Sequence, residues 1–295
     1  MQGEFAMNMD ADQGRAARSG KVVRNGRIKQ ALTRWCLHDL GEKWTMEKIC
    51  RVAVDLGVPA VEAVPPADFP LLRRYGLVSA LTTSHLFVRG MNNPRHWDEC
   101  LSKLGTAIEA NAEAGFPNVA TFAGFSDTTV PEAGAPAGSR VTREQGIHNC
   151  VEGYKKIVGH AEKKKVTLCL EPLNSREAAG MKGHPGYQGD HIDFCIEVID
   201  KVGSPALKLL FDAYHVQIMD GDLIRRIRSL GGRIGHVQVA GNPGRGEPDA
   251  TQEINYPPVM RALLESGYDG YVGLEFIPVR DALQSLTDAV ALLDV

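Results

Sequence analysis

Polar side chains end four consecutive β-rich runs in the second half of the chain. Glu171 directly follows the apolar run VTLCL, and Glu275 closes the run YVGLE. Asp212 and Gln238 hold matching positions in the two runs between them. A carboxylate at the end of a buried strand is costly unless it is paired or binds a metal ion. A single residue of this kind is usually solvated or half of an ion pair, but four in succession indicate a site.

The three carboxylates in this set would repel one another, and their pKa values would rise unless a cation lay between them. Oxygen ligands without a thiolate favour a hard divalent ion such as Mg²⁺ or Mn²⁺. We therefore expect one metal ion to be bound by Glu171, Asp212, Gln238 and Glu275. Strand alternation places His236 on the same face as Gln238 but one layer deeper, so His236 is the rival ligand and Gln238 the preferred one.

These side chains need elements that bring them to one place, and the chain from residue 30 alternates short β-like runs with longer helical patterns. The β-like runs are 31–37, 60–64, 77–82, 118–123, 166–171, 207–212, 234–239 and 271–276. The helical patterns are 45–57, 67–75, 96–115, 143–164, 190–202, 217–230, 256–267 and 280–293. Strict alternation of strands and helices predicts a parallel sheet.

Eight such units in one chain favour a single closed (β/α)₈ TIM barrel, which makes the fold class α/β. In such a barrel the carboxyl ends of the strands and the loops after them form the active site, so the four polar strand ends would be neighbours on one rim. A doubly wound open sheet is the alternative fold. The first β-like run is followed by no GxGxxG motif, which weakens a dinucleotide-binding interpretation.

The composition is that of an ordinary globular protein. Of the 295 residues 43% are hydrophobic and 23% charged, and the net charge of −3 argues against nucleic acid as a partner. The six cysteines form no CxxC pair and lie in apolar patterns, which is typical of reduced core residues. No apolar run is long enough for a membrane span, and no export signal is recognisable, so we expect a cytoplasmic protein.

The first 29 residues differ from the rest of the chain. They are rich in small and polar residues, and residues 15–29 carry six basic residues and no acidic one. A basic arm for nucleic acid is one interpretation, but a poorly ordered extension is preferred. We therefore expect an N-terminal extension over 1–29 and one catalytic TIM-barrel domain over 30–295.

The segments LCLEPLN, LLFDAYHVQIMDGD, GHVQVAGNPGRGEPD and QEINYPPVMRALLESGYDGYVGLEF together resemble the hydroxypyruvate isomerase group of the xylose isomerase-like barrels. The resemblance covers residues 30–295 and is strongest after residue 165. It implies that the four strand-end residues bind one divalent ion, Mn²⁺, Mg²⁺ or Co²⁺, and that Glu171 and Glu275 flank the substrate as catalytic residues. Related barrels have His where this chain has Gln238, and Gln is known in the hydroxypyruvate isomerases.

Further polar residues fit the same pattern as substrate-binding candidates. His215 lies three residues after Asp212, and Arg245 lies in the GNPGRGEPD loop, where its guanidinium could grip a carboxylate. Glu247 in the same loop could pair with Arg245. His85 follows the third β-like run, and the glycine-rich loop 182–191 offers His184 or His191. The last three are loop histidines, which are as often simply exposed.

Two other features lie on the expected rim. Trp35 would end the first strand and line the site as an apolar wall, although core packing is the stronger interpretation. The long loop 125–142 could act as a lid or as an interface.

A metal ion between two opposed glutamates suits proton abstraction next to a carbonyl. The expected activity is that of a metal-dependent isomerase, with hydroxypyruvate converted to tartronate semialdehyde as the preferred reaction. A ketose 3-epimerase or keto-sugar isomerase is the near alternative, and a phosphodiester hydrolase or a non-catalytic barrel is more remote. A small-molecule substrate is the expected partner, and a homo-oligomer stays open.

Overall fold

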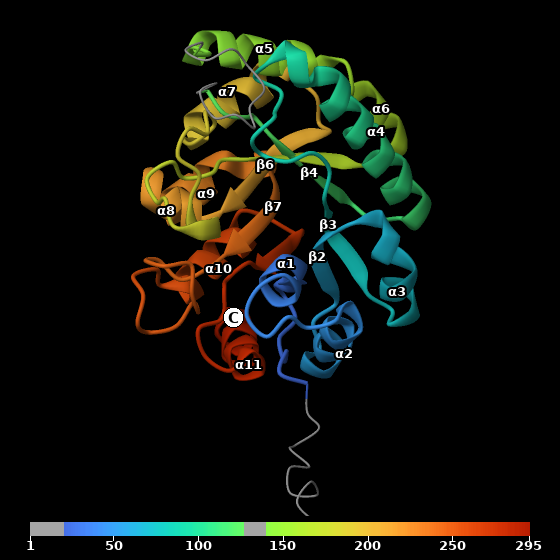
Figure 1. Ribbon diagram of the computed structural model, residues 1–295. Coiled ribbons are helices and arrows are strands. Elements are labelled where there is room, and N and C mark those ends of the chain that lie inside the picture. The colour runs from blue at the N-terminus through green and yellow to red at the C-terminus, as the bar shows by residue number, and fades with distance from the viewer. Residues whose placement is uncertain (1–20, 127–139) are drawn as a thin grey trace, which may run out of the picture.

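Eight parallel strands close into a barrel in the computed structural model, which describes residues 21–126 and 140–295 (Figure 1). The strands are β1 (Lys29–Thr33), β2 (Ala60–Val64), β3 (Val78–Thr82), β4 (Asn118–Phe122), β5 (Thr167–Glu171), β6 (Leu207–Asp212), β7 (Ile234–Val239) and β8 (Tyr271–Leu274). Each strand pairs with the next one in the sequence, and β1 pairs with β8 to close the sheet. The predicted TIM barrel is confirmed.

Helices cover the outside of this barrel. They are α1 (Arg34–His38), α2 (Met46–Leu56), α3 (Phe69–Arg74), α4 (Trp97–Ala114), α5 (Arg143–Lys155), α6 (Val158–Lys164), α7 (Ile192–Val202), α8 (Ala213–Met219), α9 (Leu223–Leu230), α10 (Tyr256–Glu265) and α11 (Ala282–Leu293). Short 3₁₀ turns lie at Pro66–Asp68, Pro94–His96, Gly180–Lys182 and Gly231–Arg233. None of the described helices is long and apolar enough to cross a membrane.

The register of the strands determines which side chains meet at the rim. Asp212 on β6 pairs with Gln238 on β7, and Gln238 in turn pairs with Gly273 on β8. Glu275 comes two residues after Gly273, directly beyond the end of β8. The predicted neighbourhood of consecutive strand ends is therefore a direct result of the hydrogen-bonded ladder.

The first predicted strand is wrong over its second half. The run 31–37 ends as a strand at Thr33 and continues as helix α1, so Trp35 lies on this short helix and not on a strand. Two predicted helices are also each divided. A break at 156–157 separates α5 from α6, and the turn DGD at 220–222, where Gly221 and Asp222 have positive φ, separates α8 from α9. Short apolar runs do not distinguish a buried strand from a buried helix turn, and a polar turn inside a long pattern is easily overlooked.

The core supports the expected state of the cysteines, since all six are buried and free. Residues 1–20 of the expected extension, and most of the loop 125–142, lie outside the described residues. The remaining part of the extension, from residue 21, contacts the barrel. The amides of Val22 and Val23 donate to the carbonyl of Leu56, and Ile28 is buried.

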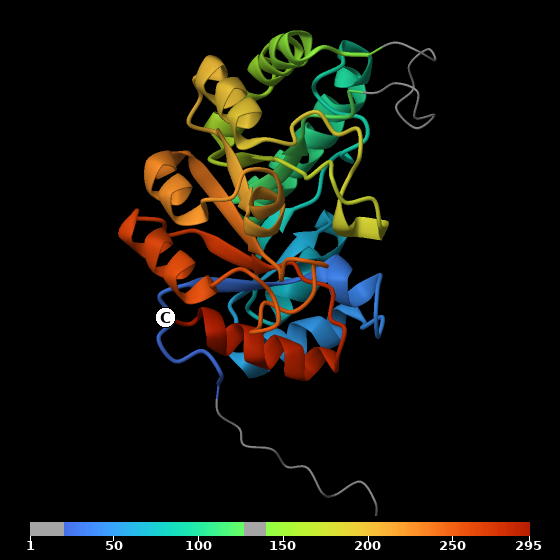
Figure 2. The ribbon, with the colours of Figure 1, turned by 90° about the vertical axis from the view of Figure 1, so that its left-hand side faces the viewer.

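The beginning and the end of the described chain lie side by side in both views of the ribbon (Figures 1 and 2). The carboxylate of Asp294 accepts hydrogen bonds from the backbone amides of Arg24, Asn25 and Gly26 at 2.5, 2.7 and 2.8 Å. Burial acts to raise the pKa of Asp294, but these three hydrogen bonds together outweigh it, so the pKa is lowered. The C-terminus therefore holds the segment that leads into β1.

We expect Asp294→Ala to lower the free energy of unfolding by about 1–2 kcal/mol, since hydrogen bonds to a charged group are lost. The loss should shrink as the pH falls through the lowered pKa of Asp294, because the carboxylate contributes only when it is ionised. Urea unfolding at several pH values would measure this. Asp288→Ala, which removes an exposed carboxylate of α11, is the control, and an equal loss in both variants would contradict the prediction.

Candidate active site

Four strand ends bring side-chain oxygens that could act as metal ligands to the same rim of the barrel. Glu171 ends β5, Asp212 ends β6, Gln238 lies on β7, and Glu275 follows β8. Their exposed fractions are 6%, 0%, 1% and 6%. Asp212 also caps the start of helix α8, because its side chain accepts a hydrogen bond from the amide of Tyr214 at 2.8 Å. The sequence thus brings together three carboxylates and one amide, all out of contact with most of the solvent.

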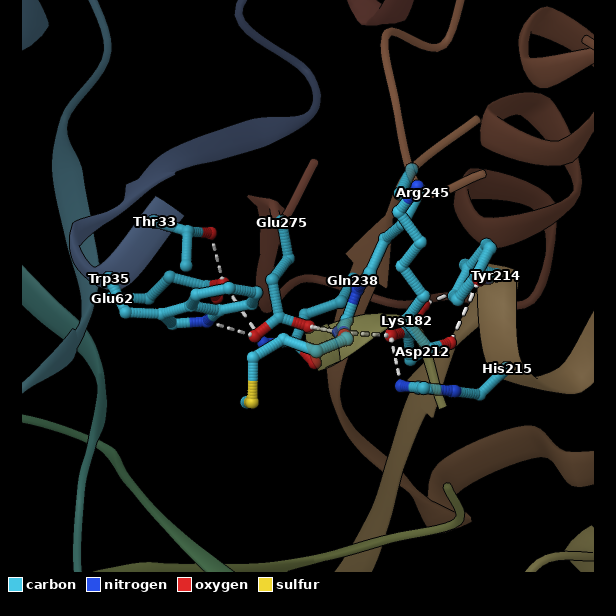
Figure 3. A network of polar contacts seen from close by, with 12 residues as sticks. Thr33, Trp35, Glu62, Lys182, Asp212, Tyr214, His215, Gln238, Arg245 and Glu275 are labelled. Carbon is cyan, nitrogen blue, oxygen red and sulfur yellow. Dashed lines mark hydrogen bonds and ion pairs between the residues drawn. The ribbon is translucent and has the colours of Figure 1, made fainter. Parts of the chain in front are cut away.

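Arg245 supplies the positive charge at this rim (Figure 3). Its guanidinium donates to Asp212 at 3.3 Å and to Glu275, and its other terminal nitrogen donates to the carbonyl of Met181. The rings of Trp35 and Tyr214 lie 5.2 and 5.4 Å from the guanidinium carbon, a distance typical of cation–π contacts. Arg245 has a φ of 57°, a backbone conformation that non-glycine residues seldom adopt. The loop therefore holds this arginine over the carboxylates at a cost in backbone strain.

The pKa values of the rim carboxyls are all raised, and burial is the largest cause in each case. For Glu171, the charges of Glu275 and Asp212 raise the pKa further. Burial raises the pKa of Glu275 to about 8, while Arg245 opposes the shift. Burial raises the pKa of Asp212, and Arg245 again opposes it. The site therefore disfavours full ionisation of its carboxyls unless more positive charge is supplied.

The side-chain amide of Gln238 uses its nitrogen in a hydrogen bond and leaves its oxygen available. Its nitrogen donates to the Glu62 carboxylate at 3.0 Å, while its oxygen is buried and has no hydrogen-bond partner among the residues that the structure describes. An unpartnered buried carbonyl beside carboxylates of raised pKa is a fit for a hard divalent cation, which takes oxygen ligands. Glu171, Asp212, Gln238 and Glu275 are the residues that could hold such an ion.

His215 fits the role of a hydrogen-bond donor better than that of a metal ligand. Its Nδ1 accepts from the backbone amide of Asn174 at 3.1 Å and faces the Asn174 side-chain nitrogen at 2.7 Å, so the ring proton must be on Nε2. Nε2 lies 3.5 Å from Asp212 Oδ2 and has no hydrogen-bond partner within residues 21–126 and 140–295. Burial, followed by the charge of Arg245, lowers the pKa of His215 far below its usual value. The ring is neutral near pH 7 and directs an N–H toward the rim.

The same histidine belongs to a group of possible ligand atoms. Among residues 21–126 and 140–295, the group of acidic and histidine atoms close enough to share an ion consists of Glu171, Asp212 and His215, all within 4.8 Å. Since the Nε2 of His215 carries the proton, this atom faces Asp212 as a hydrogen-bond donor group, whereas the oxygen of Gln238 could serve as a ligand.

A cavity of about 150 Å³ opens beside these residues. Its wall is largely apolar and includes Trp35, Leu81, Phe87, Phe122, Leu173 and Met181, while Glu171, Gln238, Arg245 and Glu275 form its polar end. Trp35 also donates from its indole nitrogen to Glu275 at 2.8 Å. The predicted apolar wall is present, although Trp35 reaches it from helix α1.

Two predicted histidines line this cavity. His85 is buried with both ring nitrogens engaged, since Nδ1 faces the carbonyls of Leu86 and Arg89 and Nε2 bonds Thr121 at 2.9 Å. Burial lowers the pKa of His85 to about 4. His184 packs against the ring of Phe87, and burial, helped by Arg245, lowers its pKa to about 4 as well. Both rings are therefore neutral parts of the wall.

His191 is not brought to the cavity. It lies exposed before helix α7, and its Nδ1 bonds Asp220 at 2.8 Å. The other histidine of the same loop, His184, is the one that faces the site. The expected partner of Arg245 also differs, because Glu247 bonds Ser285 and the amides of Val279 and Arg280 instead.

Sequence reasoning missed Glu62. This residue of β2 is fully buried and bonds Thr33, His236 and Gln238 beneath the rim. His236, the rival ligand, is therefore occupied by Glu62 on its Nε2 side. The signal in the sequence was the single charge inside the apolar run AVEAV.

A family model described as the xylose isomerase-like TIM barrel matches residues 46–293. The chain belongs to this family. Within this xylose isomerase-like family, a 2-oxo-tetronate isomerase of Pectobacterium atrosepticum is 38% identical over 241 residues, which are 77% of this chain and 85% of that protein. A putative hydroxypyruvate isomerase of Homo sapiens is 37% identical over 137 residues, or 46% of this chain and 48% of that protein. The chain matches about half the length of the first curated relatives.

Solved structures share the fold of this xylose isomerase-like barrel. The crystal structure of an AP endonuclease, family 2, from Brucella melitensis has a TM-score of 0.72 and 23% identity, and covers 88% of this chain and 96% of that one. At this identity the likeness concerns the fold alone.

Binding of a divalent cation should release protons from the raised carboxyls, and apparent affinity should increase as the pH rises toward 8. The reason is that ligation needs the ionised form, which burial disfavours at Glu171, Asp212 and Glu275. Calorimetric titration with Mn²⁺ at pH 7, in two buffers of different protonation enthalpy, would count the protons. Glu275→Gln should release fewer, and an equal number in both proteins would contradict the assignment.

Proposed function

We propose that this protein is a metal-dependent isomerase of a small hydroxy-keto acid, with conversion of hydroxypyruvate to tartronate semialdehyde as the preferred reaction. The observation that carries the proposal is the meeting of four oxygen donors from β5 to β8 beside one small cavity. The names of the relatives, hydroxypyruvate isomerase and 2-oxo-tetronate isomerase, support the same reaction class.

The proposed metal ion, Mn²⁺, Mg²⁺ or Co²⁺, would be held by Glu171, Asp212, Gln238 and Glu275. When bound, it would supply stabilisation of the negative charge that develops on the substrate oxygens. The choice of ligands rests on the unpartnered oxygen of Gln238 and on the crowding of the three carboxyls.

The two glutamates would transfer the proton. They come from β5 and β8, two strands that are not neighbours in the barrel, so they can approach a bound substrate from different sides. One carboxylate removes a proton from C3 of hydroxypyruvate and leaves an enediolate, the proton of the C3 hydroxyl moves to the C2 oxygen, and the other glutamate, in its protonated form, delivers a proton to C2. The hydrogen bond from Trp35 holds the Glu275 carboxylate in position for such a transfer.

His215 and Arg245 would bind the substrate. The neutral imidazole of His215 offers its Nε2 proton to a carbonyl or hydroxyl oxygen. The guanidinium of Arg245 would grip the substrate carboxylate in a bidentate manner once the positive charge of the metal ion compensates Asp212 and Glu275. His85 and His184 would contact the substrate through their ring faces and edges.

The size of the cavity favours a small substrate. A dry cavity of about 150 Å³ accommodates a molecule of roughly six heavy atoms such as benzene, and the cavity here has about the same volume. Hydroxypyruvate or a four-carbon keto acid fits this size better than a hexose. The relatives named 2-oxo-tetronate isomerase make a four-carbon keto acid the second candidate substrate. A ketose, as the substrate of a 3-epimerase, is the third.

Deuterium should enter carbon-bound positions of hydroxypyruvate in D₂O, and only in the presence of Mn²⁺ or Mg²⁺. Glu171→Gln and Glu275→Gln should each slow the exchange by about 10²–10⁴-fold, because each removes one proton-transfer group. Glu197→Gln, on the exposed face of α7, is the matched control. NMR would follow the label. If no carbon-bound deuterium appears with any keto acid or ketose, a phosphodiester hydrolase or a non-catalytic barrel becomes the better account.

Arg245→Lys should separate keto acids from sugars. A lysine keeps the charge but loses the two-pronged grip, so kcat/KM for hydroxypyruvate should fall about 100-fold. For a neutral ketose the fall should be less than about tenfold, because no carboxylate is bound. Equal losses on both substrates in steady-state assays would show that Arg245 does not recognise a carboxylate.

A further inference from the structure

A fully buried carboxylate lies below the proposed metal ligands. Glu62 has no exposed surface, and its two oxygens meet three donors (Figure 3). Oε1 accepts from Thr33 at 2.6 Å and from the Gln238 amide at 3.0 Å, and Oε2 lies 2.5 Å from Nε2 of His236. A buried carboxylate is tolerated only with such partners, so Glu62 has a fixed position.

The backbone is built to hold this carboxylate. The register of β2 against β3 shifts on both sides of Glu62, and the next residue, Ala63, has a φ of 54°. Such a bulge redirects a side chain at a cost in strain. On β8, which is separated from β2 by β1 alone, Gly273 leaves the necessary space, since a Cβ there would lie 2.0 Å from a Glu62 oxygen. The strained backbone at Ala63 and the glycine at position 273 therefore both make room for the Glu62 carboxylate and direct it inward.

Glu62 determines which end of the Gln238 amide faces the rim. The Oε1 atom of Glu62 accepts the hydrogen bond from Gln238, so the nitrogen end of the amide is turned toward Glu62. The oxygen of Gln238 is then the atom that has no partner in the described part of the chain. The oxygen and nitrogen ends of an amide have nearly the same shape. Without the hydrogen bond to Glu62, the Gln238 amide could turn over, and a cation at the rim would then face the positively polarised NH₂ group and be repelled.

We propose that Glu62 is a positioning residue that makes Gln238 an oxygen ligand for the metal ion. This inference rests on the proposed function, because it assumes that an ion is bound at the four strand ends. The role is distinct from ligation, since Glu62 acts through the Gln238 amide. It also accounts for a glutamine at this position, because an amide needs an acceptor on one side to be a dependable ligand on the other.

The test is Mn²⁺ binding to the purified full chain, measured by the electron paramagnetic resonance signal of free Mn²⁺. Glu62→Gln should raise the Kd about 10–100-fold. The reason is that one amide oxygen replaces two carboxylate oxygens, and the new amide nitrogen competes for the oxygen of Gln238. An unchanged Kd would overturn the positioning role.

The same substitution is then made in a Gln238→Glu variant. It gives a result there that a merely structural or purely electrostatic role of Glu62 would not produce. In the Gln238→Glu variant two carboxylates face each other, so adding Glu62→Gln should now lower the Kd. The reason is that the amide introduced at position 62 donates to the carboxylate at position 238 and leaves the second oxygen of that carboxylate free. The same substitution thus changes sign between the two backgrounds. A rise in Kd in both backgrounds would show that Glu62 contributes only its negative charge, and would overturn the proposal.

Two controls separate the possible failures. Asn111→Ala removes a buried side-chain hydrogen bond of α4 to the carbonyl of Asn118, away from Gln238. It should lower the melting temperature without changing the Kd, and a Kd rise equal to that of Glu62→Gln would overturn the specific role. If the wild-type chain binds no Mn²⁺, the proposed metal site itself is wrong and the positioning role falls with it. If the wild type binds and only the sign change is missing, the proposed function stands and the inference alone fails.

Discussion

Repulsion between buried carboxylates is the constraint on which the rest of the site depends. Glu171, Asp212 and Glu275 converge on one rim, and Glu62 lies beneath it, all with little or no exposure to solvent. Charges interact strongly in an interior of low dielectric constant, so the buried carboxylates need compensating partners. Thr33, His236 and Gln238 satisfy Glu62, while Arg245 lies against Asp212 and Glu275. The remaining demand for positive charge is what a divalent cation would meet.

The barrel makes this concentration of charge tolerable. Strands β5 to β8 hold the oxygen ligand groups through a hydrogen-bonded ladder, and the side chain of Asp212 caps the start of helix α8. The large apolar core around the strands provides the stability that the polar rim lacks. Loop residues then supply what the strands cannot, namely the guanidinium of Arg245 and the neutral imidazole of His184, while His215 on α8 adds a second neutral imidazole. Rigid strands position the proposed ligands, and the residues after them adjust the electrostatics.

The sequence was sufficient for the fold and for the strand-end residues, because both depend on repeated local patterns. A carboxylate that directly follows an apolar run can be recognised from the sequence alone, and Asp212 and Glu275 were recognised in this way. Glu62 was missed because a bulge turns it inward, and no local pattern announces the positive φ of Ala63. The choice between His184 and His191 depended on the path of a glycine-rich loop. Trp35 was placed on a strand but lies on helix α1, because a short, mainly apolar run such as LTRWCL is compatible with either a strand or a helical turn.

Anomalous diffraction from crystals grown with Mn²⁺ would test the central claim most directly. The account predicts one strong peak at the rim, with an oxygen of Glu171, Asp212, Gln238 and Glu275 each within about 2.0–2.6 Å. The amide nitrogen of Gln238 should remain on Glu62, and His215 should stay outside the ligand shell. A peak ligated by His215 in place of Gln238, or no peak at the rim, would contradict the account.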